Sequence, residues 1–340
     1  MVPFLFGQYK IFFPYDKGRK HAYSSRYDLI SATTSLKFKY MKKNLFPSGW
    51  YYMADSKTIK KGKIKPFKYF DMDLALGRTS TGKIQLFKAH CPHLGAHIGL
   101  GGKFDGEQVV CPFHGWKHTL DKMCDKGLKI SSLPVQENWG KVFMWYSNDH
   151  RAPDYDVVPL DQLGKGHFTL HTNTLIIKAP LVEICENMPD LDHYVYVHGM
   201  KDTKFTKMDI KKNTFEFNFK IDTSATITKD LKSECQNTFY GPGIMWVNLT
   251  HVFQMKSSVT LTPIDANTTY MHQQIHIPKL FNPLKLLSLY LPLCFIYKKE
   301  MKKDTVLWEN KIVGGNKYQL LQESHIFKLR NWINSLVTPP

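Results

Sequence analysis

The stretch AHCPHLGAHIGLGGKFDGEQVVCPFHGWKH, residues 89–118, contains two short clusters of metal-binding side chains. Cys91-Pro-His93 and Cys111-Pro-Phe-His114 are separated by 17 residues, and each cluster supplies one thiol and one imidazole. A pair of loops with this composition predicts a metal centre held between them, because thiolate and imidazole are the soft and borderline ligands that transition metals prefer.

Two kinds of centre fit these ligands. Two cysteines and two histidines satisfy a tetrahedral zinc ion, but zinc sites usually take two cysteines from one turn and two histidines from the other. A mixed pair in each loop suits a two-iron, two-sulfide cluster, in which one iron is bound through sulfur and the other through imidazole. The turn-forming residues of the loops also favour backbone N–H groups aimed at cluster sulfur; they are Pro92, Gly95, Pro112 and Gly115.

The pattern Cys-x-His, spacer, Cys-x2-His resembles a Rieske iron–sulfur domain, and the segments CPHLGA and CPFHGW carry the resemblance. It implies that the two cysteines and two histidines of these clusters bind a 2Fe-2S cluster. Three nearby histidines, His90, His97 and His118, fall outside the pattern. We expect these three to be ordinary solvated or core side chains.

The composition is that of a globular protein with one large or two ordinary domains, since 43% of the 340 residues are hydrophobic and 22% are charged. The six cysteines have no paired spacing outside the two clusters, which favours a reducing compartment and free thiols. The net charge of +17 indicates an anionic partner, which is nucleic acid, an acidic protein or a membrane surface, unless the charge serves solubility alone. No recognisable nucleic-acid module accompanies this charge, so we expect no nucleic-acid partner.

The chain divides into three expected parts. Residues 1–45 form a basic, aromatic arm, and residues 46–150 alternate short strands with Gly, Lys and Asp turns, as in a small all-β domain. A stretch rich in Pro, Asp and Gly follows as a linker, and residues 165–340 form a second domain. In it, runs such as TFEFNFKID, IMWVNLTHVFQMK, SSVTLTPI and TTYMHQQIHI predict antiparallel strands, with helical patterns around them. The predicted fold class is α+β.

A second metal site is predicted in the segment ENMPDLDHYVYVH, residues 186–198. His193 and His198 lie five residues apart, and a helix that loosens between them lets both bind one ion. With one carboxylate and open positions they would form the two-histidine, one-carboxylate face of a non-haem iron(II) oxygenase. Taken alone, the two histidines read as ordinary core or surface residues.

The order of the two motifs resembles that of the Rieske non-haem iron oxygenases, over roughly residues 45–320. This resemblance implies a catalytic domain with a helix-grip sheet and a third iron ligand far downstream. Several acids compete for that role, namely Asp265, Glu300, Asp304, Glu309 and Glu323. The segment KKDTVLWENK, residues 302–311, resembles the steroid-acting branch, and on that resemblance we choose Asp304, with Glu309 as its rival.

In this family the cluster of one subunit supplies electrons to the iron of the neighbouring subunit. The electrons pass through an acidic residue just before the first iron-binding histidine. The resemblance therefore implies a homotrimer in which Asp190 is the bridging residue, with Asp192 as an alternative bearer of that role. Without the resemblance, Asp190 reads as a helix cap or a solvated acid. Asn187 lies three residues before Asp190, as in the steroid branch, and joins it as a candidate catalytic residue.

The expected activity is hydroxylation or desaturation of an apolar substrate by O2, and the resemblance to 3-ketosteroid 9α-hydroxylase and cholesterol 7-desaturase relatives implies a sterol or steroid. A non-steroid substrate, or a Rieske carrier without catalysis, is the alternative. The chain has no Rossmann Gly-x-Gly-x-x-Gly and no flavin motif, so we expect a separate NAD(P)H-dependent reductase or ferredoxin.

We expect the chain to be cytoplasmic, or bound peripherally to a membrane that faces the cytoplasm. The first residues lack a basic n-region and a small-residue cleavage site, so no secretory signal is evident. The most apolar run, Leu286 to Tyr297, has 12 residues and is interrupted by Pro292, so it is too short to span a bilayer. It is expected to be either a buried core helix or an interfacial helix that collects a lipid-soluble substrate.

Overall fold

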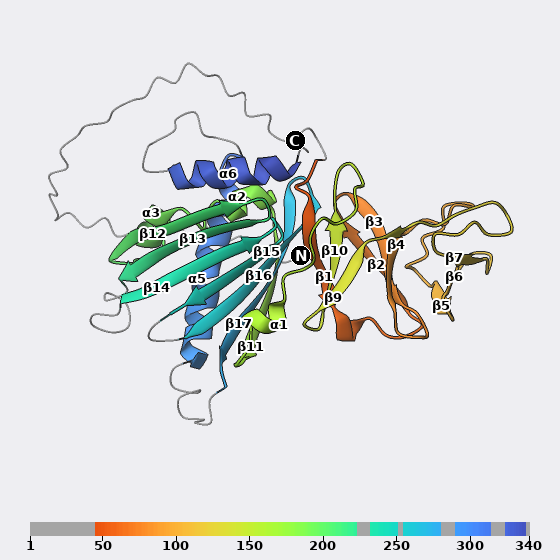
Figure 1. Ribbon diagram of the computed structural model, residues 1–340, viewed down its shortest axis with the longest axis horizontal. Helices are drawn as coiled ribbons and strands as arrows, with labels where there is room; N and C mark the ends of the chain where they lie inside the picture. Colours follow the sequence, from red (N-terminus) through yellow and green to blue (C-terminus); the bar gives the residue numbers. More distant parts are fainter. Residues whose placement is uncertain (1–44, 223–231, 251–253, 280–289, 314–323, 338–340) are drawn as a thin grey trace, which may run out of the picture. The chain divides into compact units, whose positions relative to one another are not determined.

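The computed structural model describes residues 45–222, 232–250, 254–279, 290–313 and 324–337. The predicted arm, residues 1–45, therefore lies outside the described residues except for residue 45. The described part consists mainly of antiparallel sheets, with few helices (Figure 1).

Residues 49–146 form three small antiparallel sheets, two of which build the body of the first domain. The first sheet has the order β1-β10-β9 and the second the order β2-β3-β4-β8, while β5-β6-β7 is a separate hairpin-like sheet that supports the second Cys/His loop. The strands are β1 (Gly49–Asp55), β2 (Ile64–Tyr69), β3 (Met72–Arg78), β4 (Ile84–Lys88), β5 (Lys103–Asp105), β6 (Gln108–Val110), β7 (Lys117–Thr119), β8 (Ser132–Leu133), β9 (Val135–Asn138) and β10 (Lys141–Tyr146), with the short 3-10 helix η1 (Ser56–Thr58) after β1.

Residues 167–278 form one seven-stranded antiparallel sheet with the order β11-β17-β16-β15-β14-β13-β12. Its core strands alternate buried apolar residues with polar ones, which gives the sheet an apolar face; Phe215, Phe217 and Phe219 lie on it. The strands are β11 (His167–Ile177), β12 (Asp202–Lys211), β13 (Thr214–Asp222), β14 (Lys232–Tyr240), β15 (Ile244–Leu249), β16 (Met255–Asp265) and β17 (Thr268–Pro278).

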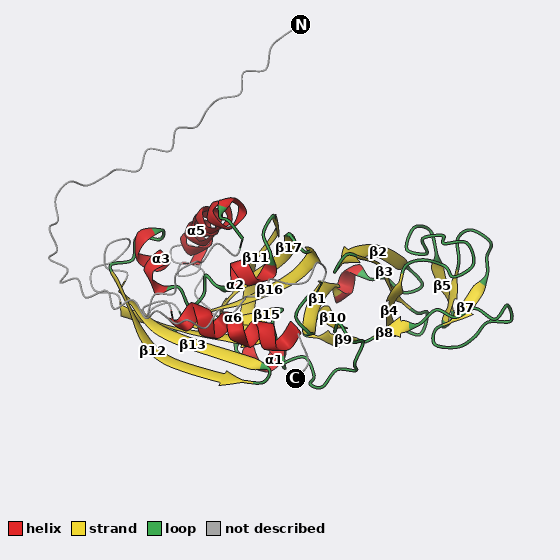
Figure 2. Ribbon diagram, turned by 90° about the horizontal axis from the view of Figure 1, so that it is seen from above, coloured by secondary structure: helices red, strands yellow, loops and turns green. Residues whose placement is uncertain are grey.

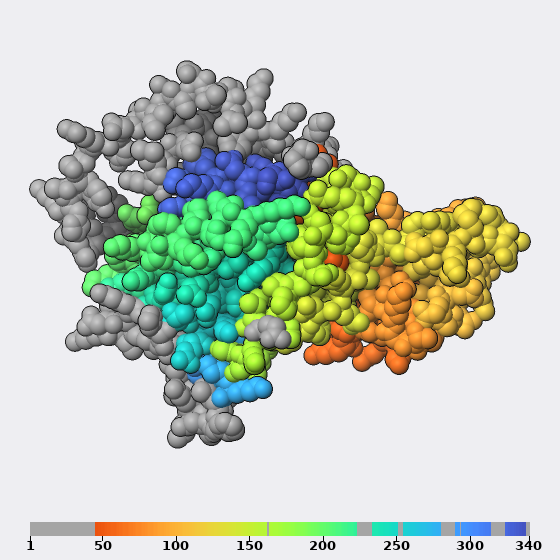
Figure 3. Space-filling model, in the orientation of Figure 1, coloured from red at the N-terminus to blue at the C-terminus, as the bar shows by residue number. Residues whose placement is uncertain are grey.

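The helices that matter for the site cover the apolar face of this sheet (Figure 2). Tyr194 packs on Phe219, and Trp332 packs on Phe215 and Phe239, so helices from two distant parts of the chain share one core. Figure 3 shows α6 reaching the surface beside the green residues of β12 and β13. The helices are α1 (Leu160–Leu163), α2 (Leu181–Cys185), α3 (Leu191–Tyr196), α5 (Leu291–Asn310) and α6 (Ser324–Val337).

The opposite face of the large sheet packs against β1. The Thr262 hydroxyl donates a hydrogen bond of 2.7 Å to the carbonyl of Tyr52, and the Tyr52 ring stacks on His272 with ring centroids 4.3 Å apart. Burial lowers the pKa of His272 to about 4, so this imidazole is neutral in the folded protein near pH 7.

The predicted α+β class with antiparallel sheets is confirmed. Two details differ from the expectation. The run IMWVNLTHVFQMK is not one strand, because β15 ends at Leu249 and β16 begins at Met255. The strands β11, β12 and β14 were not predicted, since the first two carry many exposed positions and lack a clean apolar alternation.

The apolar run Leu286 to Tyr297 is described only in part, because residues 286–289 lie outside the described residues. From Leu291 onward it is the first part of α5. None of the described helices, including the 20-residue α5, is both long and apolar enough to cross a bilayer.

Candidate metal centres

The two Cys/His loops have the same backbone turn. In each loop the glycine four residues after the cysteine donates its N–H to the cysteine carbonyl, over 2.9 Å from Gly95 to Cys91 and 3.0 Å from Gly115 to Cys111. Each cysteine N–H in turn donates to the carbonyl five residues ahead, over 2.9 Å in both loops. Both glycines have φ near +70°, a conformation that side chains rarely adopt, so the sequence requires glycine at these two turns.

The loops place their thiols inside the domain and their imidazoles nearer the surface. Cys91 and Cys111 are buried, free of disulfides and close enough to interact, and burial raises the pKa of Cys91. The rings of His93 and His114 are 4.9 Å apart, and His114 is exposed. Trp116 stacks on His93 at 4.0 Å, which fixes the orientation of that ring.

These four side chains fit a 2Fe-2S cluster better than a single zinc ion. Tetrahedral zinc would bring all four ligand atoms within roughly 4 Å of one another. Among the described residues, one group of three or more metal-binding side chains has all its ligand atoms within 4.8 Å of one another. That group does not include the four loop residues. The Cys/His set is therefore more widely spaced, as two irons require, and the buried Nδ1 of His93 has no hydrogen-bond partner in the described part of the chain.

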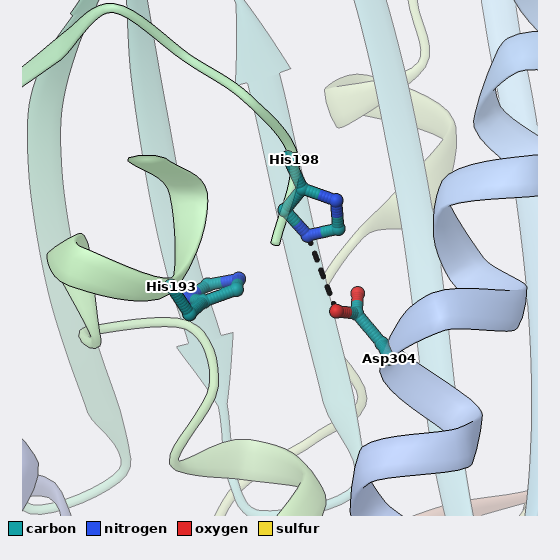
Figure 4. A group of neighbouring side chains, drawn as sticks. All are labelled: His193, His198 and Asp304. Carbon is teal, nitrogen blue, oxygen red and sulfur yellow. Dashed lines mark ion pairs between the residues drawn. The ribbon is translucent and has the colours of Figure 1, made fainter. Parts of the chain in front are cut away.

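The compact group is His193, His198 and Asp304 (Figure 4). His193 lies in α3, His198 follows the end of that helix, and Asp304 projects from α5 toward both. Three atoms no more than 4.8 Å apart can share a point within about 2.8 Å of each, close to the roughly 2.0–2.2 Å bonds that first-row metals make to such ligands. The Nε2 of His198 lies 3.2 Å from the Oδ1 of Asp304, and that buried oxygen has no well-aligned hydrogen-bond donor in the described residues.

Hydrogen bonds turn the Nε2 of His193 toward the other two side chains. Asp190 is the N-cap of α3: its Oδ1 accepts from the backbone N–H of His193 over 3.3 Å, and its carbonyl accepts a short bond from the Nδ1 of the same ring. The Nε2 is left facing the site, 3.1 Å from the side-chain nitrogen of Asn187. Burial lowers the pKa of His193, which favours the neutral ring that a metal needs.

His198 is oriented by a second acid. Its Nδ1 donates to the Oε2 of Glu300 over 2.9 Å, which leaves Nε2 for the site. Glu300 also accepts a hydrogen bond of 2.7 Å from the Nζ of Lys303, and Lys303 donates a hydrogen bond of 2.9 Å to the carbonyl of Val197. Burial lowers the pKa of His198, but the neighbouring carboxylates of Asp304 and Glu300 outweigh it, so the net shift is upward. A carboxylate behind a ligating imidazole is the arrangement that fixes the ring and raises its basicity.

The helical phase of α5 separates the competing acids. The residues of α5 that face the sheet recur at intervals of three and four, and they are Cys294, Tyr297, Met301, Asp304 and Trp308. Glu309 lies one position after the sheet-facing Trp308 and is exposed. Its carboxylate accepts a hydrogen bond of 3.0 Å from the backbone N–H of Lys178.

The other acids lie away from the Nε2 atoms of His193 and His198. Glu300 contacts the far nitrogen of His198, and Asp265 closes the turn between β16 and β17 by accepting 2.8 Å from the N–H of Asn267. Glu323 lies outside the described residues. Asp192, the alternative to Asp190, lies in the first turn of α3 and is exposed.

The contact of Glu300 with His198 was not predicted from the sequence, where Glu300 was only a rival ligand. A signal was present, because Glu300 and Asp304 are four residues apart and so lie on the same side of a helix. His118 was expected to be an ordinary solvated or core side chain; it is buried, and its ring also lies against the sulfur of Cys91.

Comparison with known proteins assigns a family to each part of the chain. The Rieske [2Fe-2S] domain family matches residues 49–136, and the family described as the 3-ketosteroid 9alpha-hydroxylase C-terminal domain matches residues 144–335, more than half of the chain. The chain belongs to this family of Rieske oxygenases. Rieske oxygenases carry a 2Fe-2S cluster and a mononuclear non-haem iron, and the residues described above fit both groups.

Several relatives of this oxygenase are similar along most of the chain. A cholesterol 7-desaturase of Xenopus laevis is 26% identical over 331 residues, covering 85% of this chain and 71% of the relative. The oxygenase component of 3-ketosteroid-9-alpha-monooxygenase of Rhodococcus rhodochrous is 24% identical, covering 84% of this chain and 81% of the relative. The crystal structure of dicamba monooxygenase bound to dicamba has the same fold, with a TM-score of 0.66, 15% identity, and coverages of 85% and 96%.

Proposed function

We propose that this Rieske oxygenase hydroxylates or desaturates a sterol or steroid. The observation that carries the proposal is the convergence of His193, His198 and Asp304 on one point beside an apolar sheet face, in a chain that also carries the Cys/His loops. Relatives named for cholesterol and for a 3-ketosteroid support the substrate class. The apolar face of the large sheet supports it as well, because buried Phe217, Val259 and Met271 belong to its core.

In this proposal residues 46–150 form the electron-transfer domain and residues 165–340 the catalytic domain. The four loop residues Cys91, His93, Cys111 and His114 hold the cluster, and the iron is held by His193, His198 and Asp304. When bound, the cluster supplies single electrons and the iron activates O2. The protein orients the iron-binding imidazoles through Asp190 and Glu300 and excludes water by burying all three side chains.

We further propose that Asp190 connects the iron of one subunit to the cluster of its neighbour, in a homotrimer. The Asp190 carbonyl touches the Nδ1 of His193, so this residue is already coupled to one proposed iron ligand. On the cluster side, His114 is exposed and lies against Phe113, which is 62% exposed, and Leu94, which follows His93 in the other loop, is also exposed. An apolar rim around an exposed cluster ligand suits docking of a protein partner.

The electrons come from a separate NAD(P)H-dependent reductase or ferredoxin. The Rhodococcus relative is named as an oxygenase component, and an oxygenase of the same fold, from carbazole 1,9a-dioxygenase, has been solved in complex with a ferredoxin (TM-score 0.60, 19% identity). The basic character of the chain, with a net charge of +17, suits an acidic donor.

We propose that the outer face of α5 touches a membrane surface and collects the lipid-soluble substrate there. Phe295 is 77% exposed and Leu291 and Ile296 are also exposed, so the start of the helix presents an apolar patch. Exposed Lys298 and Lys299 follow directly and suit anionic headgroups. Binding to anionic but not to neutral vesicles, lost in Phe295→Ser, tests this part separately.

Metal and product analysis together test the main proposal. The oxygenase should contain three irons and two acid-labile sulfides per chain, whereas a Rieske carrier would contain two irons and a zinc-stabilised module one zinc. With a surrogate reductase, mass spectrometry of a sterol and steroid panel should show a product that has gained one oxygen or lost two hydrogens. Three irons with turnover only of non-steroid compounds would move the substrate class and leave the metal sites in place.

A further inference from the structure

His118 lies outside the ligand pattern, yet its side chain reaches the proposed cluster. It sits in the middle of β7, is 1% exposed, and pairs across the strand ladder with the buried Val109. Its Nε2 lies 3.7 Å from the Sγ of Cys91, within range of a hydrogen bond to sulfur. Its other nitrogen, Nδ1, has no hydrogen-bond partner in the described part of the chain.

The chemistry of the sulfur decides which atom donates. A cysteine bound to iron is a thiolate, which has no proton and can only accept. The ring of His118 must therefore present an N–H at Nε2 whenever the cluster is in place. Since the sulfur is its one hydrogen-bonding neighbour among the described residues, the ring has no competing partner to turn toward.

The contact is present on one side of the cluster site only. The two loops have matching backbone turns, so the residue seven positions after each cysteine occupies the same place in its loop. That residue is His118 in the second loop and Ile98 in the first, and both are buried. Isoleucine cannot donate a hydrogen bond, so no equivalent side-chain donor comes from Ile98.

We propose that His118 donates a hydrogen bond from Nε2 to the Cys91 thiolate and thereby raises the reduction potential of the cluster. Reduction adds one negative charge, and a donor that withdraws charge from a ligand sulfur stabilises the reduced form more than the oxidised form. His118 is thus a positioning residue for electron supply. The proposal rests on the cluster assignment made above.

The test measures the midpoint potential of the cluster in the full chain, with no substrate present. His118→Phe fills a similar space without a donor, and His118→Gln keeps an N–H. His97→Phe is the matched control, because His97 is a half-buried histidine of the same domain with no contact to a cluster sulfur among the described residues.

We expect His118→Phe to lower the equilibrium constant for reduction at least tenfold, which is 59 mV for one electron. His118→Gln should fall between the wild type and His118→Phe, and His97→Phe should match the wild type. If His118→Phe loads no cluster, His118→Leu gives the same comparison with a smaller apolar side chain. A wild-type potential in a loaded apolar variant overturns the proposal. A wild-type chain that binds zinc and no iron–sulfur cluster would instead overturn the cluster assignment itself.

Discussion

Replacing Glu300 should weaken iron binding without touching an iron ligand. The side chain of His198 is only 7% exposed, so water cannot replace the acceptor that Glu300 provides for its Nδ1. Leaving a buried donor unpaired costs about 1–3 kcal/mol. Independently, loss of the partner behind a metal-bound histidine lowers metal affinity about 10- to 100-fold, or about 1.4–2.7 kcal/mol. The two magnitudes agree, so we expect the Kd for Fe(II) of Glu300→Ala to rise by one to two orders of magnitude.

A second effect of removing Glu300 should also raise the Kd for Fe(II). Glu300 neutralises Lys303, whose Nζ lies 2.7 Å from its carboxylate, and removing the acid leaves this positive charge near the iron site. Glu300→Gln keeps an oxygen that can accept from His198 but loses the charge, so its Kd should rise less than that of Glu300→Ala.

The assay is competition for Fe(II) with a chelator, using the Rieske absorbance of each sample to normalise for intact protein. Glu309→Gln is the matched control, since Glu309 lies on the same helix but faces away from the iron site. If Glu300→Ala holds Fe(II) within about twofold of this control, the ring orientation of His198 does not depend on Glu300 and the reasoning fails.

Three further predictions concern the iron ligands, the link between the centres, and acid stability. Asp304→Ala should keep the Rieske spectrum, lose about one of three irons and be inactive, whereas Glu309→Ala should keep all three; the reverse result in metal analysis would move the carboxylate to Glu309. Asp190→Asn should retain both metals but lose nearly all turnover. Because asparagine also caps helices, the free energy of unfolding should change by less than about 1 kcal/mol. Near-normal turnover would exclude the bridge. The pKa of His272 is lowered to about 4 by burial, so the unfolded chain binds an extra proton below about pH 6.5 and stability falls as the pH drops from 6.5 to 4. His272→Phe should remove up to about 3 kcal/mol of that loss in denaturation curves, and an unchanged pH dependence would contradict it.

The cluster loops were predictable because their chemistry is local. Cys91 and His93 lie within one turn, as do Cys111 and His114, and glycines in a left-handed conformation shape both turns. The burial of Asp304 and the exposure of Glu309 were also within reach of the sequence, since the apolar residues around them repeat every three to four positions and place Asp304 on the buried stripe.

The remaining features depend on contacts between distant segments. His118 reaches Cys91 only because the β5-β6-β7 sheet folds against the first loop. The spacing of residues in the sequence does not predict this contact. The partner of His198 is 102 residues away in Glu300. The strand β12 was missed because it is an edge strand, and with one neighbour and much exposure it carries little apolar periodicity.

The beginning of β1 is held by the end of α6. The N–H of Ser48 donates 2.8 Å to the carbonyl of Leu336, and the side-chain amide of Asn148 donates to the carbonyls of Phe46 and Val337. During translation, these hydrogen bonds to Leu336 and Val337 can therefore form only after α6 has left the ribosome. A deletion that removes the end of α6 would accordingly leave the N–H of Ser48 without its acceptor and the Asn148 amide with one acceptor fewer, so damage at the C-terminal end of the described chain would loosen the start of the first domain.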